Sequence, residues 1–546
     1  MRFPAWRLSP TKLTVLLSAY FAFVLNWAFF RTVFQSYQPT GTAGDYFVYT
    51  VPLVLWALCY ILLLLLSLPY VHKIIIPLLL ILSAAVSYHS VFFNVYFDRH
   101  MLDNVLQTTP AESARMVSFS YVAWLLLLGV LPALLYVRTQ CLYAVWWKEI
   151  AKRVMALGLS FVVILGVAAV YYQDYASFFR NHADIKHLIV PSNFITAGVS
   201  KLKRLRAENM PYAALGKDAK LNKSDKQRNV VIMVLGETTR AQNWGLNGYE
   251  KQTTPKLAAR LQKGEAVINF PNVSSCGTAT ALSVPCLFSS MGREQYNEVK
   301  ANRQDNILDT LQYAGAQLHW VENNSDCKGV CERIPTTNTI QLNLPDYCTD
   351  GECLDNIMLP ELDKLLNAPS EQDLVVVLHS IGSHGPTYFE RYTAQERLFT
   401  PTCDTREINR CSNDKLRNTY DNTIVYIDQL LDQIIHRLEQ RPDWKSSLLF
   451  VSDHGESLGE NGMYLHGTPY AIAPEYQTRV PMTMWLSPAW LKQKSTDLAC
   501  LNSQSKQAYS HDNIFHTLVG LSDADPRTIS QYRADEDILA KCRGNH

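Results

Sequence analysis

Five long apolar runs lie in the first third of this 546-residue chain. Each run is about 20 residues long, which is enough for a helix to cross a hydrocarbon core of about 30 Å. Only helices and closed barrels satisfy their backbone in lipid, and these runs lack the strict alternation of barrel strands. The sequence therefore predicts a transmembrane domain of five helices within residues 1–172. The runs are Leu13–Phe30, Tyr46–Tyr70, Ile74–Phe97, Phe119–Val137 and Val154–Tyr172.

Basic residues are concentrated in alternate connections between these runs. The loops after the first and third runs carry fewer of them, and cytoplasmic loops are the ones enriched in Lys and Arg. The N-terminus is therefore expected in the cytoplasm, and an odd number of spans places everything after Tyr172 outside. No small-x-small cleavage motif follows the first run, which favours an uncleaved anchor. The basic residues are Arg2, Arg7, Lys12, Lys73, Arg138, Lys148, Lys152 and Arg153.

The cysteines support this topology independently. Two of the 12 lie in the membrane part, and the other ten lie in the second half of the chain. An even number of closely spaced cysteines on the external side is typical of disulfides formed in an oxidising compartment. A zinc ribbon is the alternative, but ten cysteines do not divide into sets of four ligands. The neighbouring pairs are Cys276/Cys286, Cys327/Cys331, Cys348/Cys353 and Cys403/Cys411, which leaves Cys500 and Cys542.

Residues 173–228 form a predicted bridge between the membrane part and an outer domain at 229–546. Apolar and basic residues are mixed up to Leu205, which suits either an interfacial segment on anionic lipid or an amphipathic helix packed on the domain. The polar stretch from Leu215 to Arg228 is typical of a linker. With a net charge of +1 and 18% charged residues, the chain lacks the basic surface of a nucleic-acid binder.

Three β-rich apolar runs predict a buried parallel sheet in the outer domain: Asn229–Gly236, Leu374–His379 and Ser447–Ser452. Polar residues follow these runs, where ligands bind in such sheets. They are Glu237, His384, Asp453 and His454. The carboxylates and imidazole of Glu237, Asp453 and His454 suit zinc or manganese. A glycine-rich loop leads to His466, which either returns over this site or lies on the surface.

The loop from Ser275 to Cys286 is the predicted source of a nucleophile. Thr280 would open a helix, where free amides and the helix dipole favour a phosphate. A hydroxyl bound to a divalent cation loses its proton more easily, and the alkoxide can attack phosphorus. Thr278 and Ser283 are alternatives to Thr280, and any of the three is compatible with a simple helix cap.

Five motifs resemble those of the bacterial phosphoethanolamine–lipid A transferases, a family that includes the mobile colistin-resistance proteins. The resemblance covers essentially the whole chain and implies an α/β/α sandwich like that of alkaline phosphatases and sulfatases. The motifs are Gly236-Glu-Thr-Thr-Arg240, Ser275-Cys-Gly-Thr-Ala-Thr-Ala281, Asn323-Asn-Ser-Asp326, Ser383-His-Gly-Pro386 and Ser452-Asp-His-Gly-Glu-Ser-Leu-Gly-Glu-Asn-Gly462.

The resemblance implies roles for individual residues. It assigns one zinc ion, or two, with Glu237, Thr280, Asp453 and His454 as ligands and Thr280 as nucleophile. His384 and His466 match positions for substrate binding, leaving-group protonation or a second metal. Thr278, Asn324 and Lys328 match substrate contacts. Five disulfides fit the family, including Cys500–Cys542. The chain departs from the family's mobile members at Leu282, where they carry an aromatic residue.

The implied reaction moves phosphoethanolamine from phosphatidylethanolamine onto Thr280 and then onto a phosphate of lipid A, releasing diacylglycerol. Such a modification lowers the negative charge that cationic peptides such as polymyxins bind. The expected protein is a monomer in the bacterial inner membrane with a periplasmic catalytic domain. Transfer to a lipopolysaccharide core sugar, transfer of phosphoglycerol, and a non-catalytic membrane-anchored sensor are the alternatives. A sulfatase is disfavoured because the chain has no Cys-x-Pro-x-Arg motif.

Overall fold

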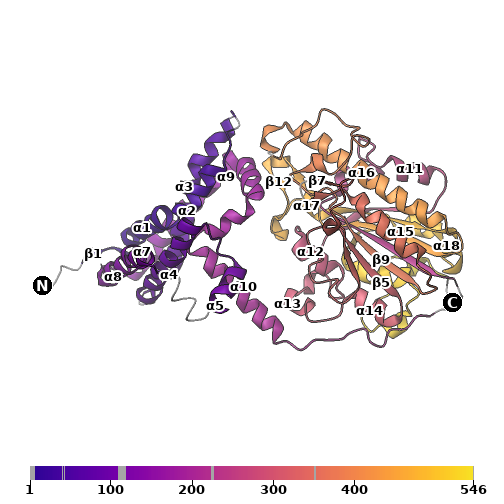
Figure 1. Cartoon of the computed structure of the whole chain (residues 1–546), viewed down its shortest axis with the longest axis horizontal. Helices are drawn as coiled ribbons and strands as arrows, with labels where there is room; N and C mark the ends of the chain where they lie inside the picture. Colours follow the sequence, from indigo (N-terminus) through magenta and orange to yellow (C-terminus); the bar gives the residue numbers. More distant parts are fainter. Residues whose placement is uncertain are drawn as a thin grey trace. The chain divides into compact units, whose positions relative to one another are not determined.

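The computed structural model describes residues 6–39, 41, 43–69, 71–107, 118–222, 227–349, 352–406 and 408–544. The chain forms two compact units, Met1–Leu205 and Arg206–His546 (Figure 1). The division falls inside the predicted bridge of residues 173–228. Each unit has its own hydrophobic core.

Four helical segments of the first unit are long and apolar enough to cross a membrane. They are Ala43–Leu66, which contains α3 (Phe47–Leu66), α4 (His72–Phe93), Phe119–Arg138, which ends in α8 (Leu131–Arg138), and α9 (Trp146–Asn181). A bent pair, Pro10–Leu25 and Trp27–Ser36, makes a fifth if it counts as one span. The prediction of membrane-spanning helices is confirmed, with four or five as the count.

The bend of 53° in the first pair has a clear cause at Asn26. This residue is fully buried, and its side-chain amide donates to Phe21 O at 2.9 Å and to Val190 O at 2.8 Å. Val190 N donates back to Asn26 Oδ1 at 2.8 Å. A side chain inserted in this way breaks a helix, because it competes with the main-chain ladder. It also ties the first span to the chain that follows α9.

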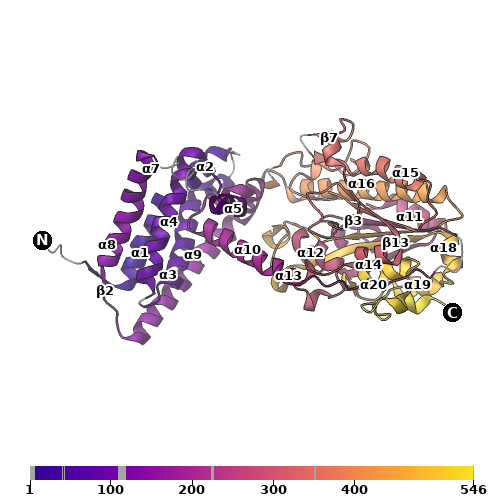
Figure 2. The same cartoon turned by 60° about the horizontal axis from the view of Figure 1, so that its bottom comes forward.

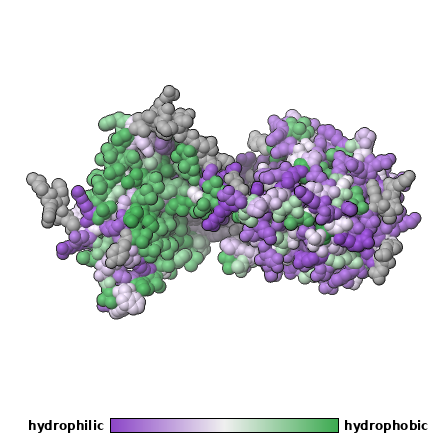
Figure 3. All heavy atoms as spheres, turned by 90° about the horizontal axis from the view of Figure 1, so that it is seen from below, coloured by the Kyte–Doolittle hydropathy of each residue, from purple (hydrophilic) through white to green (hydrophobic). Residues whose placement is uncertain are grey.

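The surface of the membrane unit is largely hydrophobic (Figure 3). Figure 2 shows α1 (Pro10–Tyr20), α3, α4 and α9 side by side. In the most apolar stretch of 18 residues in α9, only 6% is buried. Four of its apolar side chains, Leu159, Val162, Leu165 and Val170, are each more than 60% exposed. Exposed apolar area on this scale is unstable in water and suits lipid.

The predicted bridge is mainly helical as far as Glu208, and its residues up to Leu205 belong to the membrane unit. α9 continues past Tyr172 to Asn181, and α10 (Ser192–Glu208) follows a short 3-10 helix, η4 (Ala183–Leu188). Phe178, Ile185 and Leu188 are buried in the core of the membrane unit. The apolar side chains before α10 are therefore covered by the transmembrane helices.

The outer unit is built on an eight-stranded sheet of order β14-β4-β13-β10-β3-β9-β5-β6. Its strands are β3 (Asn229–Gly236), β4 (Val267–Ser274), β5 (Gln317–Glu322), β6 (Thr336–Asn338), β9 (Leu374–His379), β10 (Lys445–Ser452), β13 (Arg479–Leu486) and β14 (Tyr509–Ser510). The three predicted runs are β3, β9 and β10, and β3 pairs in parallel with both of the others. The predicted parallel sheet is therefore confirmed.

Helices cover both faces of this sheet (Figure 2). α15 (Leu359–Asn367) and α16 (Asn413–Glu439) lie on one side, and α14 (Ile307–Ala314) and α20 (Asp512–Leu521) lie on the other. β3, β9 and β10 are buried along their whole length, because both faces are covered. This arrangement leaves the carboxyl ends of the strands as the accessible edge.

Five disulfides cross-link loops of the outer unit, and Cys59 and Cys141 are free. The disulfides pair the cysteines as the sequence suggested: Cys276–Cys286, Cys327–Cys331, Cys348–Cys353, Cys403–Cys411 and Cys500–Cys542.

Candidate metal centre

The parallel register of β3 and β10 brings three potential metal ligands together. Gly236 pairs with Ser452, so Glu237 and Asp453 leave the sheet at the same level. His454 follows directly. The ligand atoms of Glu237, Asp453 and His454 all lie within 4.8 Å of one another, and the three residues are at most 1% exposed.

The cluster fits a divalent cation. His454 Nε2 lies 3.3 Å from Glu237 Oε1 and 3.4 Å from Asp453 Oδ2. His454 Nδ1 lies 3.0 Å from Gly455 O, so Nδ1 carries a proton and Nε2 is the nitrogen that faces the cluster. Asp453 Oδ2 is buried and has no hydrogen-bond partner among the described residues. A buried oxygen of this kind needs a partner, and two carboxylates with one imidazole are a donor set that zinc accepts.

The pKa values of the three groups are strongly perturbed. Burial raises the pKa of Glu237, but the hydrogen bond and charge of His454, together with the charges of His384 and His466, outweigh burial and hold the pKa well below its usual range. Burial and the charge of Glu237 raise the pKa of Asp453 to about 7. Burial lowers the pKa of His454, but the two carboxylates outweigh it and raise the pKa to about 9. Such shifts cluster at functional sites.

Thr280 is the first residue of α12 (Thr280–Leu287) and points its hydroxyl at this cluster. Its Oγ1 lies 3.0 Å from Glu237 Oε2 and 3.3 Å from His454 Nε2. The alternatives are engaged elsewhere: Thr278 Oγ1 donates to Thr468 O at 2.6 Å, and Ser283 Oγ donates to Asp453 O. Of the three hydroxyls proposed from the sequence, the structure brings that of Thr280 into contact with the carboxylate and the imidazole.

The two other predicted histidines lie beside the cluster. The ring centroid of His466 is 4.3 Å from that of His454, and the ring of His384 is 5.8 Å from that of His466. His466 Nδ1 also lies 3.2 Å from Glu456 Oε1, a buried carboxylate. The loop of His384 can pass close to Glu237 because of Gly382: a Cβ there would lie 2.6 Å from Glu237 O, and φ is +51°.

The remaining predicted residues occupy different positions. Asn324 Nδ2 donates to Glu237 Oε2 at 3.0 Å, so it contacts a metal-binding carboxylate directly. Thr278 binds the loop after His466, because Gly467 N also donates to Thr278 O at 2.8 Å. Lys328 Nζ donates to Ser325 Oγ at 2.9 Å, within its own turn. Leu282 is 42% exposed, and its side chain packs over Gly277 in the loop before Thr280.

A buried carboxylate behind Asn324 was not identified from the sequence. Glu322 ends β5 and accepts hydrogen bonds from Trp320 Nε1 at 2.8 Å and Asn324 N at 2.6 Å. Its Oε2 lies 3.0 Å from His379 Nδ1. Burial lowers the pKa of His379, but the hydrogen bond and charge of Glu322, together with the charges of Glu237 and Asp453, outweigh burial and raise the pKa. The signal for Glu322 in the sequence was its position directly before the motif Asn323-Asn-Ser-Asp326.

A second overlooked residue, His511, links the loop of the nucleophile to β10. Cys276 N donates to its Nδ1 at 3.1 Å, and its Nε2 donates to Ser452 O at 2.9 Å. Burial lowers its pKa to about 3, so the ring is neutral. His511 lies outside every motif, and only the fold brings it beside residues that are distant in the sequence.

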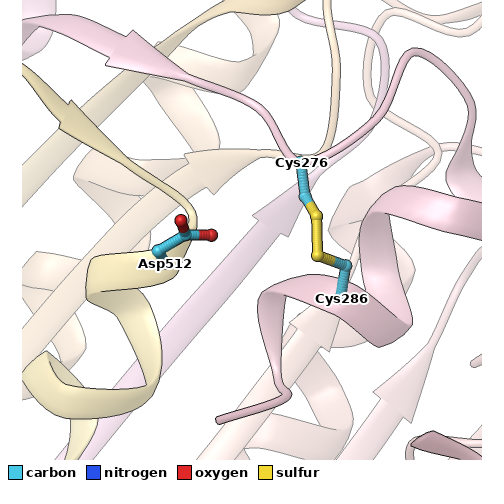
Figure 4. Close-up of side chains that lie close together, drawn as sticks. All are labelled: Cys276, Cys286 and Asp512. Carbon is cyan, nitrogen blue, oxygen red and sulfur yellow. A yellow bond between two sulfur atoms is a disulfide. The ribbon is translucent and has the colours of Figure 1, made fainter. Parts of the chain in front are cut away.

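A second group of potential metal ligands contains Cys276, Cys286 and Asp512 (Figure 4). Figure 4 shows the disulfide that joins Cys276 to Cys286 on α12, with Asp512 at the start of α20. The two sulfur atoms are bonded to each other, so they are not thiolates and do not bind a metal as such. Asp512 Oδ1 instead accepts a hydrogen bond from Arg293 N at 2.8 Å.

Known proteins resemble both units. A family model described as "Sulfatase" matches residues 229–524, and one described as "Phosphoethanolamine transferase EptA/EptB" matches residues 55–205. The chain is 42% identical to phosphoethanolamine transferase EptA of Escherichia coli (strain K12), over 97% of this chain and 96% of that protein. It is 37% identical to phosphatidylethanolamine transferase Mcr-1 of Escherichia coli, over 94% and 95% of the two chains.

A solved structure extends the similarity to three dimensions. The integral membrane protein lipooligosaccharide phosphoethanolamine transferase A (EptA) from Neisseria meningitidis is 52% identical, with a TM-score of 0.66. The match covers 99% of this chain and 100% of that one. Because the similarity spans both units and the family resemblance is confirmed, the chain belongs to the EptA family of phosphoethanolamine transferases.

Proposed function

We propose that this protein transfers phosphoethanolamine from phosphatidylethanolamine to a phosphate of lipid A, with Thr280 as the nucleophile. The observation that carries this proposal is the position of Thr280 Oγ1, at 3.0 Å from Glu237 and 3.3 Å from His454. Thr280 is also the first residue of α12, where backbone N–H groups favour a phosphate. Membership of the EptA family and the hydrophobic surface of the first unit support two lipid substrates.

In the first step Thr280 Oγ1 gives its proton to Glu237 Oε2, which accepts its hydrogen bond at 3.0 Å, and attacks phosphorus of the donor. The bond from Oγ1 to phosphorus forms, the bond from phosphorus to the glycerol oxygen breaks, and diacylglycerol leaves once that oxygen has taken a proton. We assign the protonation to His384 or His466, whose rings lie beside His454. An imidazole suits this role because its pKa is near neutral.

In the second step an oxygen of a lipid A phosphate attacks the phosphorus on Thr280. The bond from phosphorus to Oγ1 breaks, and Oγ1 takes back its proton from Glu237 Oε2. Asn324 holds Glu237 in place through both steps, since its amide donates to Oε2. Thr278 holds the loop of His466, and Lys328 lies four residues beyond Asn324, where its ammonium is available to a phosphate.

Zinc is the cofactor we propose, with Glu237, Asp453, His454 and Thr280 as its ligands. When bound, it would lower the pKa of the Thr280 hydroxyl and offset negative charge that develops on phosphate oxygens. Asp453 Oδ2, which is buried without a hydrogen-bond partner among the described residues, supports this assignment. Metal analysis of the purified protein measures whether one or two zinc ions are bound per molecule.

We place the protein in the bacterial inner membrane as a monomer, with five spans and a cytoplasmic N-terminus. Residues 173–228 would then bridge to a periplasmic catalytic domain. Five disulfides in the outer unit support an oxidising compartment. Transfer of phosphoethanolamine would lower the negative charge of lipid A and raise resistance to polymyxin.

The test is to trap the phosphorylated enzyme. The full-length protein in detergent is incubated with phosphatidylethanolamine, and the peptide that carries Thr280 is analysed by mass spectrometry. We expect phosphoethanolamine on Thr280, none in Thr280→Ala, and unchanged labelling in the control Thr496→Ala, a threonine outside the cluster. Label on another residue would overturn the nucleophile assignment. Lipid analysis of expressing cells checks the acceptor, because a product on a core sugar in place of lipid A would contradict it.

A further inference from the structure

A cavity of about 400 Å³ lies within the membrane unit, between the start of α5 (Arg99–Gln107), η4 and α10. Its lining includes Arg99, Lys186 and His187 together with the hydroxyl-bearing face of α10. Its walls belong to segments that directly follow the spans α4 and α9. The cavity therefore lies where two transmembrane helices end.

Hydrogen bonds between distant segments hold the walls together. The carbonyl of His187 accepts from Phe97 N at 3.0 Å and from Asn193 Nδ2 at 2.9 Å. Asp98 Oδ1 accepts from Met101 N at 2.8 Å and so caps α5. The loop after α4 is thereby fixed against the chain before α10, and the cavity is a built feature of the fold.

The charged side of the cavity is suited to a phosphate. Among the residues that the structure describes, no ion pair involves Arg99 or Lys186, although both line the cavity. Two cations with no carboxylate partner at one concave site attract an anion, and guanidinium groups bind phosphate oxygens in a fork geometry. The imidazole of His187 also lines the cavity and offers a further nitrogen for hydrogen bonding.

The hydroxyl-bearing face of α10 is suited to an ammonium group. Ser192, Thr196 and Ser200 are four residues apart on α10, so they share one helix face, and all three line the cavity. Ser192 Oγ donates to Ile189 O and Thr196 Oγ1 donates to Asn193 O, both at 2.9 Å, so their lone pairs remain as acceptors. The Asp98 carboxylate also lines this cavity.

Exposed apolar side chains on α10 and at the end of α4 favour a lipid over a free ion. Phe92 and Phe93 at the end of α4 are 55% and 63% exposed, and Val199 and Leu202 on α10 are 52% and 55% exposed. We propose that this cavity binds the headgroup of a membrane phospholipid, with the phosphate at Arg99 and Lys186 and an ammonium group at the α10 hydroxyls. Phosphoethanolamine lipids are therefore bound in preference to phosphoglycerol lipids. The site is separate from the metal centre and does not depend on the transfer reaction.

The test uses full-length Thr280→Ala protein in detergent, so that chemistry does not interfere. Short-chain phosphatidylethanolamine bearing a photo-crosslinking group is titrated, and crosslinked peptides are mapped. We expect crosslinks within residues 186–200 and at least a tenfold loss of their yield in the double variant Arg99→Gln/Lys186→Gln. The matched control Lys203→Gln/Arg206→Gln changes two basic residues of α10 that do not line the cavity, and it should keep the yield.

Several results would overturn the proposal. Equal crosslinking of the double variant and its parent would show that these cations do not hold the lipid. Equal competition by phosphatidylglycerol would refute the ammonium assignment. Competition by inorganic phosphate as strong as by the lipid would indicate a free-anion site. None of these outcomes changes the labelling of Thr280 in the wild-type protein, so failure here and failure of the proposed function can be distinguished.

Discussion

The disulfide Cys276–Cys286 is expected to serve both stability and activity, whereas Cys500–Cys542 is expected to serve stability alone. The first closes the loop that carries Thr280, and both of its cysteines are buried. The second joins α19 (Leu498–Gln504) to the 3-10 turn Ala540–Cys542, away from every residue of the metal cluster. Replacing each pair by alanine therefore gives two matched variants that differ in their relation to the site.

The lengths of the closed loops set the expected losses of stability. The sequence separations are 10 residues for Cys276–Cys286 and 42 residues for Cys500–Cys542. The loop-entropy relation gives about 3 kcal/mol for the first and about 4 kcal/mol for the second at 25 °C. Both variants lose two sulfur atoms, so packing costs largely cancel in the comparison. The pair remote from the site should thus cost more stability, by about 1 kcal/mol.

The assay combines urea unfolding of the full-length protein in detergent with labelling of Thr280. We expect Cys500→Ala/Cys542→Ala to unfold at the lower urea concentration but to label at the wild-type rate when folded. Cys276→Ala/Cys286→Ala should be less destabilised and label at least tenfold more slowly, because α12 is no longer anchored. Equal labelling rates in the two folded variants would refute the positioning argument.

Three further changes test the site. Asp453→Asn should lower the zinc content measured by mass spectrometry, and unchanged zinc would contradict the ligand assignment. The same variant should raise the melting temperature in EDTA, because burial and the charge of Glu237 disfavour the Asp453 carboxylate and raise its pKa to about 7. Glu322→Gln should cost about 1–3 kcal/mol in urea unfolding below pH 6.5 and less at higher pH. The pKa of His379 is higher in the folded than in the unfolded protein, so the His379–Glu322 pair stabilises the fold at pH values below the unfolded-state pKa. This stabilisation is lost as the pH rises through the folded-state pKa, so a loss independent of pH would count against this pair. His511→Phe should destabilise the outer unit by about 2 kcal/mol for two lost hydrogen bonds, equally between pH 5 and 8, since its pKa is about 3; a pH-dependent loss would show that the ring titrates.

Local patterns were sufficient to predict the transmembrane helices, the parallel strands and the residues at the strand ends. The length and composition of an apolar run decide whether it can span a membrane, and a buried parallel strand is apolar on both faces. Glu237 and Asp453 each follow such a run directly, so their shared edge followed from the parallel pairing of β3 and β10. The bend at Asn26 was beyond this reasoning, because its cause is a contact with Val190, 164 residues away.

The sequence alone determined the division into a membrane part and an outer α/β domain, and it identified the loop of the nucleophile. Spacing by itself left Thr278, Thr280 and Ser283 open, because all three offer a hydroxyl within six residues, and the family resemblance favoured Thr280. Only the tertiary structure separated them, by engaging the other two hydroxyls with Thr468 and Asp453 and leaving Thr280 at the cluster. The physical reason is that periodicity and composition act over a few residues, whereas a site depends on which distant side chains the packed sheet brings within hydrogen-bonding distance.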